Sequence, residues 1–586
     1  MTNIQINKLD YKLDRDKFFD KYIVYYFHVQ NQSLWNSELL DIKDDFKEIK
    51  AVAYDNKNGV YYLFEKNAVN NSLLNKIRDL GNNITYKSMN VELENYRIIQ
   101  LLIEQALSNY DTQNLRISNL TGKLYMFNPV WQNKDKSIVP TLELNITKDE
   151  TIELNVRTFT MLSKHKPDKK LNKYAKYKKG NRNTLIRCTD KDVKDTYILK
   201  RFDNKKSHID SISLDKNFNQ TKMGVLIKVM NEVNSKYTDF LHLGFIQIPN
   251  YQVIDCKSLS KSKKELNSII KTILIDKKIK IIDKVGDPNV MKLLTDILQK
   301  KWNINCQNGK TISKTGYNLV IIHEKENEVN KKYEDFHGVY NEAIVQHITY
   351  ENIENNEKSL KSTIDTIIHE LIIKEDILNG AISLYDWNRL GLTDDFKITV
   401  ETREKDLVIY TSISIKGNGH ISFRQLNNDI FNSDDFIEIT DIFLDAELKD
   451  EVVDCVIKYK DTLLAIKETN WHTISELNNI NSEIKANNTA LRNKKAIREL
   501  LPSITNITLF NYLGKQYYFV GQPSGMQSNF KEATHVRQID VRKGDDIDLI
   551  NILKMMEVVF VRNGQLTMFP FPYKYIREYL KMNSKQ

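Results

Sequence analysis

The sequence predicts a multidomain α/β protein, with an α+β N-terminal half and parallel α/β layers later in the chain. At 586 residues the chain is too long for a single hydrophobic core, so we expect several domains. Short β-branched and aromatic runs alternate with polar breaks in the first half. Between residues 279 and 323 a strand, a helix and a strand follow each other with short connections, which is typical of a parallel sheet.

The first half carries strand patterns separated by one long helical pattern. Val91 to Ser108 has apolar residues at helical spacing, which predicts a helix. Runs rich in Val, Ile, Tyr and Phe predict the strands. These expected strands are 22–29, 60–64, 141–146 and 152–156.

The second half is predicted to contain two layers. For the first layer we expect strands at 269–275, 279–282, 319–323 and 344–349, with helices at 287–301 and 360–377. For the second we expect a β-meander of strands at 396–400, 407–415 and 420–423, with a turn at Gly417-Asn418-Gly419. A later strand is expected at 463–466, and 573–580 has the composition of a closing helix.

Composition and short motifs exclude several classes of protein. The four cysteines (Cys188, Cys256, Cys306, Cys455) lack C-x-x-C spacing, which supports neither a zinc site nor a disulfide scaffold. The N-terminus does not have the pattern of a signal peptide, and no apolar run approaches the ~20 residues that span a bilayer. Neither G-x-G-x-x-G nor a Walker A sequence occurs. We therefore expect a cytoplasmic protein without a membrane or nucleotide-cofactor role.

One basic stretch is a candidate contact for a nucleic-acid backbone. The formal charge is +9, from 86 Lys and Arg against 77 Asp and Glu, which agrees with a polyanionic partner. Tyr174 and Tyr177 lie within the stretch and offer faces for base stacking. A solvated loop is the alternative. The basic residues are Lys164, Lys166, Lys169, Lys170, Lys173, Lys176, Lys178, Lys179 and Arg182.

The C-terminal segment carries the most specific pattern in the chain. An apolar run ends in Phe560-Val561-Arg562, a polar turn and a strand-like Leu566-Thr567-Met568-Phe569 follow, and Phe569-Pro570-Phe571-Pro572-Tyr573 leads into a helix. A Pro-x-Pro pair favours an extended backbone before it. The pattern resembles the end of the PIWI domain of Argonaute proteins. An edge strand and terminal helix of some other α/β domain is the alternative.

A second segment resembles the MID domain of the same family. There, an aromatic and basic pair, a strand with glutamine and a helix with lysine bind the phosphorylated 5′ end of a guide strand. The resemblance implies that Tyr333 stacks on the first base, that His337 replaces the usual basic residue, and that Gln346 and Lys374 bind the phosphate. Arg562 would reach into the same pocket from the PIWI domain.

The resemblance implies a domain arrangement and a fold for each part. We expect an N-like domain at 1–110 and a linker region with the basic stretch at 111–260, where a PAZ domain is absent or reduced. A Rossmann-like MID domain would occupy 261–378, and an RNase H-like PIWI domain 379–586.

The nuclease site of such a PIWI domain is predicted to be degenerate. Active members hold two metal ions with short carboxylate or histidine ligands. The matching positions here are Glu401, Glu468 and Glu557, and glutamate is one methylene longer than the expected aspartate. No glutamate finger is evident between residues 431 and 448. We therefore expect no catalytic residue and no catalytic metal.

The combined expectation is a catalytically inactive, guide-binding Argonaute-like protein of prokaryotic defence, most similar to the DdmE-type plasmid-defence branch. Expected partners are a short guide, with DNA favoured over RNA, complementary target DNA and a helicase–nuclease effector. Mg²⁺ at the guide 5′ phosphate is the candidate cofactor. The alternatives are a PIWI-RE protein, with Arg537 and Glu578 as its arginine and glutamate, an active guided endonuclease, and an interaction protein without nucleic acid.

Overall fold

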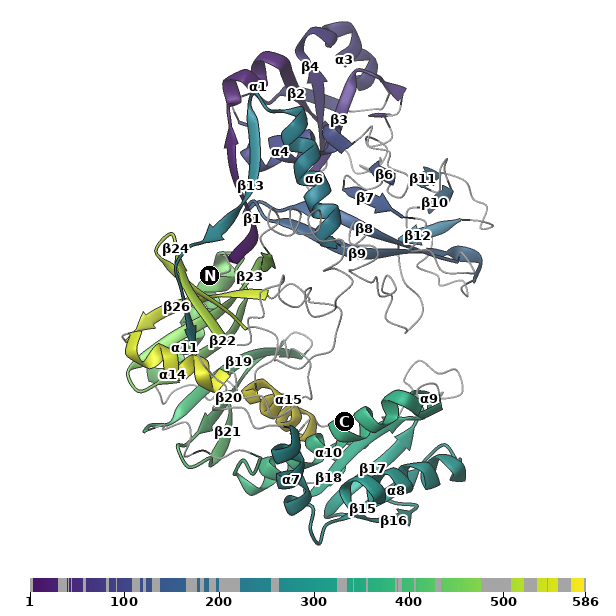
Figure 1. Cartoon of the computed structure of the whole chain (residues 1–586), viewed down its shortest axis with the longest axis vertical. Helices are drawn as coiled ribbons and strands as arrows, with labels where there is room; N and C mark the ends of the chain where they lie inside the picture. The colour runs from purple at the N-terminus through teal and green to yellow at the C-terminus, as the bar shows by residue number, and fades with distance from the viewer. Residues whose placement is uncertain are drawn as a thin grey trace, which may run out of the picture. The chain divides into compact units, whose positions relative to one another are not determined.

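The described part of the chain forms two compact units (Figure 1). The first comprises residues 1–249, 470–502 and 528–533, and the second comprises 250–469, 503–527 and 534–586. The structure is a computed structural model. It describes residues 4–29, 39, 42–43, 45–55, 59–80, 84–90, 92–107, 116–119, 123–128, 137–164, 176–179, 184–188, 196–199, 222–254, 263–323, 335–340, 342–354, 357–384, 387, 393–404, 407–426, 434–475, 507–520, 535–544, 546–556 and 571–583.

The first unit contains an antiparallel sheet packed against helices. Its strand order is β3-β4-β2-β5, which confirms the predicted strands at 22–29 and 60–64. The strands are β2 (Tyr22–Val29), β3 (Ile49–Asp55), β4 (Gly59–Glu65) and β5 (Ile84–Ser88). The helices are α1 (Arg15–Lys21), η1 (Lys66–Ala68), α3 (Asn71–Arg78), α4 (Asn95–Leu107) and α6 (Lys222–Lys236). The predicted helix is α4, which packs on β3 and α6 and is buried on nearly all sides.

A seven-stranded sheet lies within the predicted linker region. Its order is β11-β10-β12-β9-β8-β7-β6, and its paired strands are antiparallel. Its strands are β6 (Arg116–Asn119), β7 (Leu124–Phe127), β8 (Ile138–Ile146), β9 (Ile152–Met161), β10 (Lys176–Lys179), β11 (Leu185–Cys188) and β12 (Tyr197–Leu199), with the turn η3 (Leu162–Lys164) after β9. The strands predicted at 141–146 and 152–156 are confirmed as β8 and β9. Described residues between 116 and 199 thus form a folded sheet with an aromatic core.

A further strand pair joins distant parts of the chain within the first unit. β1 (Ile4–Leu13) pairs antiparallel with β13 (Leu241–Ile248). The last residues of β23 (Thr462–Ser475) pair with the start of β1, where Ser475 lies opposite Ile4.

The second unit contains the predicted parallel layer. All neighbouring strands are parallel in the order β16-β15-β17-β18, so β18 is the last strand on its side among those described. The strands are β15 (Lys278–Asp283), β16 (Asn305–Gly309), β17 (Gly316–Ile322) and β18 (Ala343–Thr349). The helices are α7 (Lys263–Ile273), α8 (Pro288–Trp302), α9 (Tyr350–Glu354) and α10 (Glu357–Asn379).

The strand predicted at 269–275 is wrong, because these residues belong largely to helix α7. Leu266, Ile270 and Leu274 recur every four residues and are 7%, 0% and 2% exposed, whereas Ile275 is 63% exposed. The amphipathic helical period therefore prevails over the strand preference of the isoleucines.

A largely antiparallel sheet forms the rest of the second unit. Its order is β14-β24-β25-β26-β23-β22-β19-β20-β21. The strands not yet given are β14 (Tyr251–Ile254), β19 (Phe396–Glu404), β20 (Leu407–Ile415), β21 (Ile421–Leu426), β22 (Val453–Tyr459), β24 (Ile507–Tyr512), β25 (Lys515–Val520) and β26 (His535–Lys543). The meander β19-β20-β21 confirms the three predicted strands. Gly419 in its turn has φ +85°, and the Trp387 ring occupies the place of a Cβ.

Helices cover both faces of this antiparallel sheet. α11 (Asp434–Leu448) packs on one face, over Val456, Leu463 and Ala465. α14 (Asp546–Met556) and α15 (Phe571–Asn583) contribute to a core that also includes α10 and the parallel sheet. Figure 1 shows α15 beside α10, and the two helices are in contact. The predicted closing helix is therefore confirmed as α15.

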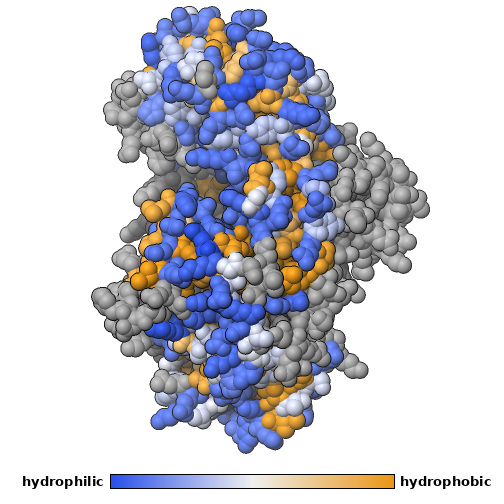
Figure 2. Space-filling view, turned by 90° about the vertical axis from the view of Figure 1, so that its left-hand side faces the viewer, coloured by the Kyte–Doolittle hydropathy of each residue, from blue (hydrophilic) through white to orange (hydrophobic). Residues whose placement is uncertain are grey.

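The described surface in Figure 2 is mainly hydrophilic, as expected from the share of charged residues in the sequence. Hydrophilic residues cover most of the described face in Figure 2, with hydrophobic residues in separate groups. Among the described helices, none has the length and apolar character needed to cross a bilayer.

Candidate functional site

Two of the predicted phosphate-binding residues meet at the edge of the parallel sheet. Gln346 lies in β18 and Lys374 lies in α10, which packs on that strand. The Lys374 ammonium donates to the Gln346 side-chain oxygen at 2.7 Å and also to the main-chain oxygen of Val345. The Lys374 ammonium thus satisfies a main-chain carbonyl of the edge strand that the N–H of a further strand would otherwise satisfy.

The C-terminal helix brings further charges to the same place. A carboxylate oxygen of Glu578 lies 3.5 Å from the Lys374 ammonium, and its other oxygen accepts from Lys574 and Lys581, both at 2.9 Å. Lys574 also pairs with Glu370 of α10, which accepts from the Gln346 amide at 2.5 Å. We call these residues the Lys374 cluster: Gln346, Glu370, Lys374, Lys574, Glu578 and Lys581.

Burial and charge make this cluster strongly coupled. Lys374 and Glu578 are both fully buried. Burial lowers the pKa of Lys374 to about 8, although Glu578 opposes the shift. For Glu578 the effect of the neighbouring ammonium groups exceeds that of burial and lowers its pKa to about 2. Both groups are therefore mainly charged at neutral pH, and three lysines against two glutamates leave a net charge of +1.

Convergent donors on a positive site can bind a phosphate group. Lysine binds phosphate as a point charge with three donors, and such charge-assisted hydrogen bonds are stronger than neutral ones. Lys574 and Lys581 have side chains that are 12% and 32% exposed, so solvent reaches the cluster from their side. Tyr333 and Arg562, the other two residues predicted for this pocket, lie outside the described residues.

The residues of the Lys374 cluster fit Mg²⁺ poorly. Mg²⁺ prefers oxygen ligands in octahedral geometry. The carboxylates of Glu370 and Glu578 each face ammonium groups, which repel a cation.

His337 lies outside the hydrogen bonds of the cluster. Its Nδ1 is 2.7 Å from a carboxylate oxygen of Asp335, and its ring centroid is 4.1 Å from that of His347. Burial, together with the charge of Lys374, lowers the pKa of His337. His337 is therefore near Lys374 but is mainly neutral at pH 7, so it does not supply the positive charge that the resemblance would assign to it.

A second buried contact fastens the terminal helix. The Tyr575 hydroxyl of α15 donates to Asp376 of α10 at 2.6 Å, and the Ser383 N–H donates to the other carboxylate oxygen at 3.1 Å. Burial raises the pKa of Asp376 to about 6. This contact and the Lys374 cluster both join α10 to α15.

The predicted nuclease positions do not come together where the structure describes them. Glu401 accepts from Arg403, which also contacts Glu447 of α11, so both lie on the α11 face of the sheet. Glu468 instead lies beside Asp454, on the opposite side of the same sheet. Burial, followed by the charge of Asp454, raises the pKa of Glu468. Glu557 lies outside the described residues.

Arg537 and Glu578 occupy different sites. Arg537 of β26 donates to Asp454 at 2.5 Å, and Tyr518 and Tyr573 also lie near it. Despite burial, these neighbours raise the pKa of Arg537 above its usual range. Glu578 belongs to the Lys374 cluster, so the arginine and glutamate considered for the PIWI-RE alternative have different partners.

The basic stretch is described in part. Lys176, Lys178 and Lys179 lie in β10, and Lys164 ends η3. Tyr177, predicted to offer a stacking face, is 2% exposed and packs in the aromatic core with Phe159, so that expectation is wrong. Its side chain faces the opposite side of the strand from Lys176 and Lys178, whereas Lys179 shares its side. The other basic residues lie outside the described residues: Lys166, Lys169, Lys170, Lys173 and Arg182.

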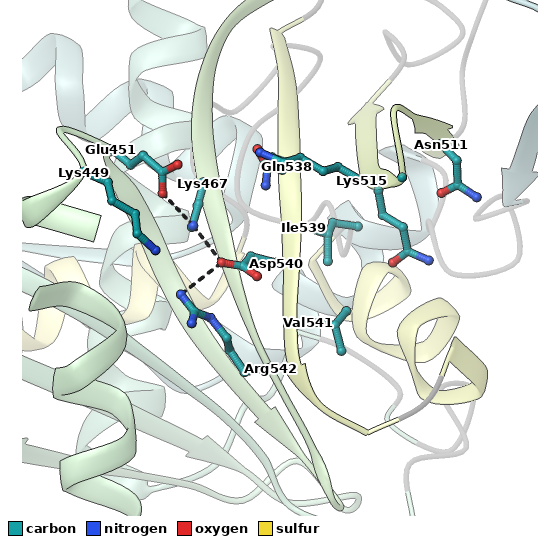
Figure 3. Close-up of a pocket in the computed structure, with 12 residues that line it drawn as sticks. Lys449, Glu451, Lys467, Asn511, Lys515, Gln538, Ile539, Asp540, Val541 and Arg542 are labelled. Carbon is teal, nitrogen blue, oxygen red and sulfur yellow. Dashed lines mark hydrogen bonds and ion pairs between the residues drawn. The ribbon is translucent and has the colours of Figure 1, made fainter. Parts of the chain in front are cut away.

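A basic hollow of about 580 Å³ lies on the antiparallel sheet (Figure 3). Lys467 points between Glu451 and Asp540, 2.7 Å from each, and Asp540 also pairs with Arg542 at 3.2 Å. Although burial opposes it, these carboxylates raise the pKa of Lys467. With Lys449 and Lys515 added, four cations against two acids give the lining a net charge of +2.

Sequence reasoning missed Glu370, Lys574 and Lys581, yet their spacing held a signal. Glu370 and Lys374 are four residues apart, as are Lys574 and Glu578, and Lys581 follows Glu578 by three. Such pairs lie on one face of a helix. The sequence does not reveal that these two helical faces meet.

Comparison with known proteins gives structural matches alone. No family model and no curated protein matches the chain. Among solved structures, it is similar to Kluyveromyces polysporus Argonaute with a guide RNA, at 10% identity and TM-score 0.47, over 98% of this chain and 93% of that one. It is also similar to A. aeolicus Argonaute (10%, TM-score 0.40, 100% and 98%) and to Drosophila Piwi (9%, TM-score 0.39, 99% and 98%). At such identities the comparison does not extend to individual side chains.

Proposed function

We propose that the chain binds a short guide strand by its 5′ phosphate and uses the guide to find complementary nucleic acid. The observation that carries this proposal is the Lys374 cluster. Gln346 and Lys374, selected because their order resembles that of a MID domain, are hydrogen-bonded to each other, and a helix some 200 residues later adds two more lysines. A polar site with three converging ammonium groups suits a phosphate.

The two carboxylates of the cluster indicate how the phosphate would enter. Glu370 and Glu578 hold the lysines and Gln346 in place, as an anionic ligand would. A guide phosphate would take over the contacts of Lys574 and Lys581 from the solvent-accessible side. Each charge-assisted hydrogen bond gained is worth about 1.5–3 kcal/mol.

The remaining basic surfaces would contact backbones without reading sequence. Lysines of β10 and the hollow shown in Figure 3 carry excess positive charge suited to phosphates. Sequence specificity would then come from pairing between guide and target. DNA is the guide and target that we favour.

We further propose that the PIWI-like part does not cut its target. Two-metal hydrolysis requires carboxylates that converge on ions about 4 Å apart. Glu401 and Glu468 point to opposite faces of their sheet, and the second lies beside Asp454. An active guided endonuclease is the alternative, and it requires Glu557 and other ligands to assemble a site.

The biological setting follows from the sequence resemblance. We propose a cytoplasmic role in prokaryotic defence against plasmids or other foreign DNA, in which a recruited helicase–nuclease destroys the target. Resemblance to DdmE-type proteins supports this role, and a PIWI-RE protein is the alternative.

A structural role for the Lys374 cluster is the competing explanation. Complete burial of Lys374 and Glu578 favours this explanation. A buried ion-pair network of this kind would hold α15 against α10 and would have no ligand. In that case the chain would bind proteins, and nucleic acid would play no part.

Nucleic acids that co-purify with the tag-free protein distinguish these functions. The proposal predicts short strands of narrow length with 5′ phosphates, identified by end-labelling and sequencing. Protein loaded with one such strand should bind its complement at least tenfold more tightly than a scrambled target, and should leave it intact in Mg²⁺ or Mn²⁺. Protein free of such strands that also fails to bind a supplied guide would support the structural role.

A further inference from the structure

Three potential metal ligands gather beside β18, on the face away from α10. Asp335 and His337 lie in the turn before the strand, and His347 lies within it. One ligand atom from each lies within 4.8 Å of the others. Asp335 Oδ1 is 2.7 Å from His337 Nδ1 and 4.0 Å from His347 Nδ1. Among the described residues this is the one such group of three.

Both histidine rings favour the uncharged form, which is the form that binds a metal ion. Burial lowers the pKa of His347 to about 3, with a smaller effect from His337, and burial also lowers that of His337. The Phe336 N–H donates to His347 Nε2 at 3.3 Å, which assigns the proton of the neutral ring to Nδ1, facing Asp335. The Nε2 of His337 is buried and makes no hydrogen bond within the described part of the chain.

We propose that Asp335, His337 and His347 bind a divalent transition-metal ion, with Zn²⁺ as the best fit. Zn²⁺ binds imidazole nitrogen and carboxylate oxygen at about 2.0–2.2 Å. Tetrahedral geometry then places ligand atoms about 3.3 Å apart. The distances of 2.7 Å and 4.0 Å bracket that value, so small side-chain rotations suffice.

The donor set also separates this site from the Lys374 cluster. Imidazole suits Zn²⁺, Cu²⁺ or Ni²⁺, whereas Mg²⁺ prefers oxygen alone. Three protein ligands leave a fourth position open for water or another anion. When Nδ1 of His347 coordinates the ion, the single proton of the neutral ring moves to Nε2, and the hydrogen bond from the Phe336 N–H is given up. The bound ion would hold the turn at 335–340 against β18, and this requires no guide strand.

Metal titration of the tag-free full chain tests the proposal. Calorimetry should show one equivalent of Zn²⁺ bound, undisturbed by a hundredfold excess of Mg²⁺. Co²⁺ bound in place of Zn²⁺ should give an absorption band in the visible range that is typical of nitrogen ligands. Asp335→Asn, His337→Gln and His347→Gln should each weaken Zn²⁺ binding at least tenfold.

His323→Gln is the matched control, because His323 also pairs with a carboxylate, Glu351, at 2.7 Å in the same layer. That variant should bind Zn²⁺ as the wild type does. Failure of the wild type to bind one equivalent would overturn the proposal. Unchanged Zn²⁺ binding in both Asp335→Asn and His337→Gln would also overturn it. These two residues lie in the turn before the strand, so their variants still test the site if His347→Gln does not fold.

Discussion

Glu578 should be the residue that fixes the terminal helix α15 most strongly. Glu578→Gln keeps the size of the side chain but removes a buried charge that faces three lysines. The difference between its ordinary pKa of 4.5 and about 2 in the folded chain corresponds to about 3.5 kcal/mol at ~1.4 kcal/mol per pKa unit. Loss of one partner from a buried ion pair costs a similar amount.

Hydrogen exchange of the α15 amides in the full chain measures this effect locally. A change of about 3.5 kcal/mol accelerates exchange through local opening by roughly 300-fold at pH 7. Because the pKa is lowered in the folded chain, the stabilisation is complete above pH 4.5 and is lost as pH falls toward 2. Arg577→Gln, an exposed change on the same helix, should alter exchange less than threefold. Equal exchange in Glu578→Gln and Arg577→Gln would refute the reasoning.

Three further predictions concern other sites. Burial raises the pKa of Asp376 to about 6, so its charged form destabilises the folded chain. The stability of Asp376→Asn relative to the wild type should therefore rise between pH 3.8 and about 6, and reach up to ~3 kcal/mol above pH 6. Thermal unfolding at pH 4 and pH 8 measures this, and an equal stability difference at both pH values would contradict it. Replacing Lys176, Lys178 and Lys179 by Gln should flatten the salt dependence of target binding by up to about 0.9 in slope per lost phosphate contact, and an unchanged slope would exclude these lysines. Guide-loaded Glu401→Gln should behave as the wild type, with target bound and uncut in gel assays, whereas wild-type cutting that this change abolishes would establish a nuclease.

Local patterns predicted most of the fold correctly. Strands such as Tyr22–Val29 and the meander after Phe396 follow from side-chain alternation and turn residues, which act over a few positions. The helix at Lys263–Ile273 was missed because β-branched residues favour strands locally, while the buried side of a helix is decided by its tertiary partners.

The candidate site was only partly predictable. Gln346 and Lys374 could be selected because a known order of motifs placed them, and they do meet. The burial of Tyr177 could not be foreseen, since it depends on which face of β10 covers the aromatic core. His337 and His347 lie close together because the turn at 335–340 folds back against β18. A single sequence does not show that the turn and the strand meet in this way.

Binding of guide strands that differ only at the 5′ end tests the central claim most directly. Loss of one charge-assisted contact of about 1.5–3 kcal/mol corresponds to a change of roughly 10- to 150-fold. The wild type should therefore bind a 5′-phosphorylated strand at least tenfold more tightly than the same strand with a 5′ hydroxyl. Lys574→Gln and Lys374→Met should remove most of that preference, and Arg577→Gln should keep it. A wild type that binds both strands equally, or variants that lose affinity equally for both, would contradict phosphate recognition at the Lys374 cluster.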